Sequence, residues 1–352
     1  MTLPSMGRST AKSVVGLDIQ PGYVAAAQTR DGVAVERAAI APLAPGVVRD
    51  GEVVDVDTLA DALRHMFAEH KFAKRVRLGV ANQRIVMRTL DLPPMQSAKE
   101  IASAVRFQAQ DHIPMPLEQA VLEYQSLGLV ETHEGPRTRV VVVAARRDMI
   151  DRQLEAIKRA GLRAHGIDLS AFAMIRALHQ PGATATTLYV AVGGITNLAV
   201  AVGTTCVFTR VVAHGTEAMA GELAERKGLT LEHAHGWLRH VGLGTPVAEI
   251  EGDAEIVTEA REVLEEGSRK IADEVRNSID FHVMQVGSAG VERAVLTGPA
   301  VAIPGLADEL AELTRLPLEV GIVAEARPGA FGSTDGGSLA VAAGLTVEEV
   351  SA

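Results

Sequence analysis

The residues best suited to chemistry lie in glycine turns that join predicted strands. The first turn follows Asp18 and consists of Gln20, Pro21, Gly22 and Tyr23. In such a hairpin the backbone N–H groups of the turn can bind a phosphate, and an acidic residue at the end of the strand can organise a hydrated magnesium ion. This turn is therefore a candidate site for a phosphorylated ligand, with the metal at Asp18.

A second turn of the same kind follows much later in the chain and contains Gly193, Gly194, Ile195 and Thr196. The strands around the first turn, VGLDI, YVAAAQT and VAVERAAI, have counterparts around the second in TLYVAV, ITNLAVAV and TCVFTRVVA. A single glycine turn between strands is usually structural. The duplication favours two similar domains that clamp a nucleotide, with a third turn at Gly298-Pro299 after a late strand.

The composition excludes several classes of protein. The 352 residues are 47% apolar and 22% charged, which predicts a sizeable core and two domains. A formal net charge of −10 lacks the basic excess of proteins whose main partner is nucleic acid. Cys206 is the single cysteine, which is typical of a reducing cytoplasm and predicts a buried, inert thiol.

One uncharged stretch, residues 188–208, is long enough to suggest a membrane-spanning helix. Glycines interrupt it, and the segments between them are valine-rich and of strand length, so we predict buried strands instead. Helical spacing and caps predict helices at residues 57–70, 97–112, 148–160, 216–227, 231–241, 254–286, 304–314 and 339–345. The helix at 97–112 begins with a capping box, Ser97 to Glu100.

Several longer segments resemble one family. They are LDLPPMQSAKEIASAVRFQAQDHIPMPLEQAVLEYQ (90–125), GLDI (16–19), AGLRAHGIDLSAFAMIRAL (160–178), IADEVRNSIDFHV (271–283) and AVLTGPAVAIPGL (294–306). They are similar to the PilM family of type IV pilus assembly proteins, which belongs to the actin-like ATPase superfamily together with FtsA. The first segment is specific to that family, and the resemblance covers roughly residues 13–348.

The resemblance implies an α/β, actin-like fold of two lobes with duplicated RNase H-like domains and an inserted small α+β subdomain, called 1C. The first lobe (1A) would comprise residues 13–92 and 163–185, subdomain 1C residues 93–162, and the second lobe (2A and 2B) residues 186–348. ATP with Mg would lie between the lobes, held by the three glycine turns. Gly298 and Pro299 would lie on the adenosine side.

The resemblance also implies a partner and a location. Proteins of this family act at the inner face of the cytoplasmic membrane, which they reach through partners and not through a membrane segment of their own. They bind the N-terminal tail of PilN, a single-span protein, in a groove between 1A and 1C, and contact other pilus platform proteins. Ile101, Val105 and Ala109 share one helical face, which can pack on the subdomain's own sheet or form a wall of this groove, and both can hold along one helix.

The sequence departs from the family at three places in the nucleotide site. Ala191 stands where the second turn is normally preceded by Asp, and residues 234–238 lack the Glu and Lys that contact adenosine in related proteins. Pro299 replaces a glycine and has no N–H to donate. These departures predict a weakened or purely structural nucleotide site, and no catalytic residue is assigned. The alternative is that Asp18 alone organises the metal and slow hydrolysis persists.

Two other functions are compatible with the fold: an FtsA-like division protein and a phosphotransferase such as a sugar kinase. Weaker site candidates have structural interpretations beside the functional one. His233, His235 and His240 lie in one helical segment at spacings that suit a metal poorly. Asp168 could face the nucleotide or cap the following helix, and Arg276 and Asn277 could face adenosine or solvent.

Overall fold

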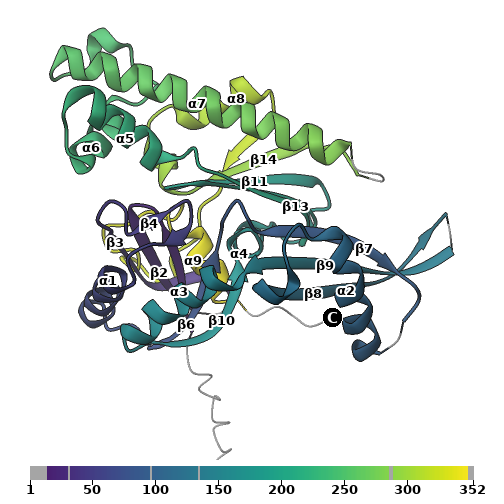
Figure 1. Ribbon diagram of the computed structural model, residues 1–352. Coiled ribbons are helices and arrows are strands. Elements are labelled where there is room, and N and C mark those ends of the chain that lie inside the picture. The colour runs from purple at the N-terminus through teal and green to yellow at the C-terminus, as the bar shows by residue number, and fades with distance from the viewer. Residues whose placement is uncertain (1–13, 31, 96, 134, 285–287, 348–352) are drawn as a thin grey trace, which may run out of the picture.

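The computed structural model of the chain describes residues 14–30, 32–95, 97–133, 135–284 and 288–347 (Figure 1). The predicted outer limits of the lobes, residues 13 and 348, lie outside these ranges, as does Asp31 in the predicted turn between the second and third strands. The fold is α/β and has two lobes, each built on a five-stranded sheet.

The first lobe contains a mixed sheet in the order β10-β6-β1-β2-β3. Its strands are β1 (Val15–Gln20), β2 (Tyr23–Arg30), β3 (Ala34–Pro42), β6 (Arg75–Val80) and β10 (Arg163–Leu169). The first three strands are antiparallel, whereas β6 and β10 run parallel to β1. Helices α1 (Val56–Glu69) and α3 (Arg147–Arg159) bury their apolar faces in one core with this sheet. A short hairpin, β4 (Val48–Arg49) and β5 (Glu52–Val53), precedes α1.

The second lobe repeats this topology in the order β13-β12-β11-β14-β15. Its strands are β11 (Thr186–Val192), β12 (Thr196–Val202), β13 (Thr205–Val212), β14 (Arg293–Thr297) and β15 (Leu318–Val320). The first three are again antiparallel and the last two parallel, which confirms the duplicated sheets and the prediction of strands at 188–208. Its helices are α5 (Thr216–Lys227), α6 (Leu231–Val241), α7 (Ala254–Val283) and α8 (Leu306–Thr314), above the sheet in Figure 1.

A third sheet is inserted into the first lobe and projects to one side (Figure 1). Its antiparallel strands are β7 (Val86–Leu92), β9 (Gly135–Arg146) and β8 (Ala120–Thr132), in that order, and α2 (Ala98–His112) covers it. Strand β7 therefore pairs within this sheet although it precedes the predicted boundary at residue 93. Helix α3 follows the sheet, but its buried Ala156 and Ile157 belong to the first-lobe core.

Two helices join the lobes through a shared core. Helix α4 (Ser170–Leu178) contacts strands of both large sheets, and α9 (Ala340–Leu345) packs on α4, β1 and β2. Helix α9 thus returns to the first lobe, whereas residues 186–348 were all expected in the second. Gly16 and Gly344 make this return possible, because a Cβ at either would lie within 1.9 Å of a backbone oxygen of the neighbouring element.

Candidate functional site

A small cavity lies where the two lobes meet, and residues of all three glycine turns surround it. Its volume is about 10 Å³. The lining residues are Asp18, Gln20, Tyr23, Ala191, Gly193, Ile195, Asn197, Thr297, Gly298, Gly337, Ser338 and Val341. Six of the residues predicted to bind nucleotide are therefore brought together across the chain. The volume is at the lower limit for one water molecule.

Asp18 is held inside the first lobe by the position of its strand. β1 is central in its sheet and buried along its whole length, so Asp18 is only 4% exposed. Gln20 Nε2 donates a hydrogen bond of 3.0 Å to Asp18 Oδ1. Burial nevertheless outweighs this bond and raises the pKa of Asp18 to about 6. Two lining residues carry buried acceptors, Gln20 Oε1 and Asn197 Oδ1, that receive no hydrogen bond from the described residues.

The other predicted residues of the two turns lie at the contact between the lobes. Gly194 faces the backbone of Pro21, and Gly193 faces the Tyr23 hydroxyl. Thr196 is fully buried, and its hydroxyl donates a hydrogen bond to the His214 carbonyl. The third turn adopts a conformation that favours glycine, with a φ of +93° at Gly298.

One residue near these turns, Glu217, was missed in the sequence. The Glu217 carboxylate, in the first turn of α5, contacts Gly22, and His235 Nε2 lies 2.9 Å from its Oε2. Pro299 begins a one-turn helix (Pro299–Ala302) and does not line the cavity. The signal for Glu217 was weak, because acidic residues are common in the first turn of helices. There they interact favourably with the helix dipole whether or not they have another role.

The residues at the cavity do not fit ATP with Mg in this arrangement. A volume of about 10 Å³ cannot hold a triphosphate, and no Lys or Arg is among the lining residues. Ala191 stands at the position where a second acidic residue was expected. It pairs with Asn197 and Thr297 on the neighbouring strands, and its side chain supplies no oxygen ligand. Magnesium is bound through oxygens, and Asp18 is the one carboxylate in the lining.

The predicted partner-binding residues lie in a core and not on a surface. Ile101, Val105 and Ala109 are 8%, 1% and 0% exposed. Ile101 and Val105 pack with buried residues of β7 and β9, and Ala109 packs with Ile113 and Ala144. Of the two interpretations of this helical face, the structure supports packing on the subdomain's own sheet. These side chains expose little surface to a partner in this conformation, and their part in partner binding stays a prediction.

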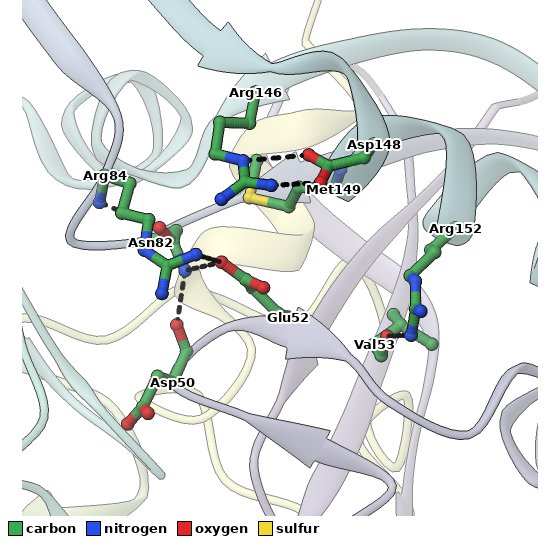
Figure 2. A network of polar contacts seen from close by, with 9 residues as sticks. All are labelled: Asp50, Glu52, Val53, Asn82, Arg84, Arg146, Asp148, Met149 and Arg152. Atoms are coloured by element: carbon green, nitrogen blue, oxygen red, sulfur yellow. Dashed lines mark hydrogen bonds and ion pairs between the residues drawn. The ribbon is translucent and has the colours of Figure 1, made fainter. Parts of the chain in front are cut away.

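A polar network lies where the first lobe meets the inserted sheet (Figure 2). The buried Asn82 donates through Nδ2 to the Asp50 carbonyl, 2.6 Å away, at the tip of the β4–β5 hairpin. Arg84 forms an ion pair of 3.1 Å with Glu52 on the same hairpin. From the other side Arg152 donates to the Val53 carbonyl, at 3.2 Å.

Two exposed arginines lie at this junction, each paired with an acidic residue. Arg146, at the end of β9, pairs with Asp148, and Figure 2 shows both above the hairpin. The side chains of Arg84 and Arg146 are 60% and 43% exposed, so they remain available to a further ligand.

The weaker candidates have structural partners. His235 contacts Glu217 and His240 contacts the Glu251 carbonyl, and among the described residues no group of three His, Cys, Asp or Glu could hold a metal. Asp168 neither lines the cavity nor caps α4; it forms an ion pair with Arg176, which also donates to the Gly344 carbonyl of α9.

Two further candidates, both on α7, lie away from the cavity. Arg276 donates to the Leu313 carbonyl of α8, and Asn277 is exposed. In the described part of the chain, no helix combines the length and apolar character needed to cross a membrane.

Comparison with known proteins identifies the family. The profile of the family described as type IV pilus assembly protein PilM matches residues 16–328. The chain belongs to the PilM family. A solved PilM-PilN type IV pilus biogenesis complex is 26% identical, with a TM-score of 0.77 over 95% of this chain and 97% of that one.

More distant structures establish the actin-like fold of this PilM family member. MreB5 of Spiroplasma citri bound to ADP is 13% identical, with a TM-score of 0.56 over 95% of each chain. The ethanolamine utilization protein EutJ from Carboxydothermus hydrogenoformans is 14% identical, with a TM-score of 0.53 over 98% of this chain and 90% of that one. At such identities the likeness concerns the fold alone.

Proposed function

We propose that this protein is an actin-like scaffold of the type IV pilus assembly platform and binds the N-terminal tail of a PilN-like single-span protein. The match that supports this proposal is to a PilM-PilN complex, because it extends over 95% of the chain at a TM-score of 0.77. The scaffold would act in the cytoplasm at the inner face of the membrane. Its attachment to the membrane would be indirect, through the tail and through other platform proteins.

The strand pairing suggests how to divide the chain. We assign residues 86–146 to subdomain 1C, because β7 pairs with β9. Helices α3 and α9 go to the first lobe, where their buried side chains pack. The remaining residues follow the predicted division.

We place the docking surface for the tail at the junction between the first lobe and 1C, where the polar network lies. Exposed guanidinium groups of Arg84 and Arg146 can donate several hydrogen bonds to the carbonyls of an extended peptide. The exposed Val54 directly follows the β4–β5 hairpin and offers an apolar contact. Ile101, Val105 and Ala109 would act indirectly by fixing α2 on the sheet.

A phosphotransferase is not favoured by the geometry. Such an enzyme needs a cleft for its substrate and a carboxylate base near the transferred phosphate. The cavity beside Asp18 is too small for ATP and too small for the molecule that would receive its phosphate. ATP hydrolysis therefore has no place in the proposed function.

Titration with a synthetic N-terminal peptide of a PilN-like protein from the same organism tests the proposal. We expect saturable binding to the wild type and at least tenfold weaker binding to the double variant Arg84→Glu, Arg146→Glu. Arg239→Glu is the matched control, since this exposed arginine lies on α6 of the second lobe. Equal affinity of all three proteins would refute the docking surface, and no binding to the wild type would refute the function.

A further inference from the structure

We infer that the cleft at the glycine turns is latched shut by the turns themselves, which occupy the space that phosphates would need. Tyr23 and Pro21 of the first turn contact Gly193 and Gly194 of the second. The Glu217 side chain of α5 contacts Gly22 of the first turn. The closed arrangement then requires no nucleotide and admits none between the turns. This inference concerns the cleft and is independent of tail binding at the junction of the first lobe and 1C.

The contact between the turns is as close as the backbone permits. A Cβ added at Gly194 would lie 2.2 Å from the Pro21 carbonyl oxygen, and one at Gly193 would lie 2.5 Å from the Tyr23 hydroxyl. The obstacle at Gly194 is backbone, so no side-chain rotation can relieve it. Neither glycine has a positive φ, and their small size is therefore required by the contact and not by the conformation.

Two of the backbone donors at the glycine turns are already used within the chain. The Gly193 N–H donates to the Ile195 carbonyl at 3.0 Å, and the Gly298 N–H donates to the Gly337 carbonyl at 3.2 Å. Pro21 and Pro299 have no N–H. A phosphate could accept from Gly193 or Gly298 only after these bonds had broken.

The charge at the cleft opposes an anionic ligand. The Glu217 carboxylate is so close to the first turn that a Cβ on Gly22 would lie 2.4 Å from its Oε2, and His235 holds it there at 2.9 Å. Burial raises the pKa of Tyr23, and the negative charges of Asp18 and Asp335 raise it further. Both carboxylates therefore lie close enough to Tyr23 to act on its hydroxyl. With no Lys or Arg among the lining residues, phosphate would face like charges at short range.

One buried water fits the cleft better than a nucleotide. The cavity volume of about 10 Å³ matches the space of a single molecule. Gln20 and Asn197 are 5% and 4% exposed, and their acceptors Oε1 and Oδ1 have no donor among the described residues. A water has two protons to donate, which would satisfy both.

Two measurements on the full chain test the latch. The first is calorimetric titration of the wild type with Mg-ATP up to about 5 mM, which lies above the roughly 1 mM upper end of common KM values. We expect no saturable heat. Saturable binding with a dissociation constant below about 1 mM would overturn the inference.

The second measurement is hydrogen exchange of Gly194→Ala, in which the turns must separate. We expect amides of segments 18–28 and 191–198 to exchange at least tenfold faster than in the wild type. Gly221→Ala is the control, because this helical glycine of α5 has no atom within 4 Å of an added Cβ. Wild-type exchange in Gly194→Ala would overturn the latch. If that variant does not fold, Tyr23→Ala provides the same readout with less strain, and unchanged exchange there would also overturn it.

Discussion

Replacement of Asp18 by Asn should stabilise the protein at neutral and alkaline pH. Asp18 is 4% exposed, and burial raises its pKa from the ordinary 3.8 to about 6. No Lys or Arg lines its cavity, and the groups near it are Gln20, Tyr23 and, through Tyr23, Asp335. The amide of Asn can keep an acceptor for the hydrogen bond from Gln20 Nε2, while the buried charge disappears.

The magnitude and sign follow from the pKa. Because the folded protein holds this proton more tightly than the unfolded chain, the favourable contribution is complete below pH 3.8 and is lost as pH rises through about 6. Above pH 6 the charged form costs the fold about 3 kcal/mol, at about 1.4 kcal/mol for each tenfold change in proton affinity. Asp18→Asn should therefore gain about 3 kcal/mol at pH 8 and less than about 1 kcal/mol at pH 4.

Urea unfolding at both pH values measures this difference, with Asp280→Asn on the exposed surface of α7 as the control. The control should change the free energy of unfolding by less than about 0.5 kcal/mol. A variant of Asp18 that is equally stable or less stable than the wild type at pH 8 would refute the reasoning. It would mean that the carboxylate has a favourable partner in the folded protein.

Three further predictions concern other parts of the fold. Arg176→Ala should lower the free energy of unfolding by about 1–3 kcal/mol in a urea titration, because it removes the ion-pair partner of Asp168, whose side chain is only 15% exposed; a loss below about 0.5 kcal/mol would contradict the role of this pair. In the same titration Val105→Ala should lower the free energy of unfolding by about 1–3 kcal/mol, whereas Phe107→Ala, at a side chain that is 73% exposed, should lower it by less than about 0.5 kcal/mol. A larger loss for Phe107→Ala than for Val105→Ala would mean that the opposite face of α2 packs on the sheet. Burial raises the pKa of Cys206 to about 12, so Ellman's reagent at pH 8 should label it only on unfolding, and rapid labelling of the folded protein would show the thiol to be accessible.

The strands and turns could be predicted because their signals are local. A glycine turn between valine-rich strands defines a hairpin by itself. Its repetition in the second half predicted two similar domains, and the two large sheets have equivalent strand orders. The inserted sheet was harder to delimit. Strand β7 follows β6 closely in sequence, but its partner β9 comes more than forty residues later, and no local pattern reveals a pairing of that length.

The candidate site shows the same limit. The sequence predicted that Asp18, Gly193 and Gly298 would meet, and they line one cavity. It could not predict that Glu217 and Tyr23 would fill the space between the turns, because that depends on how closely the lobes approach. Likewise the apolar face of α2 was visible from Ile101 and Val105, but periodicity does not say whether such a face packs on its own sheet or on a partner.

Binding of the PilN-like tail peptide to the purified protein, measured with and without Mg-ATP, is the most direct test of the scaffold function and of the latch together. The nucleotide is added at about 5 mM, again above the roughly 1 mM upper end of typical KM values. We expect saturable binding with a dissociation constant that changes less than twofold when Mg-ATP is added. No binding under either condition would contradict the scaffold function. Binding that requires Mg-ATP would keep the scaffold but show that the cleft opens to a nucleotide, against the latch.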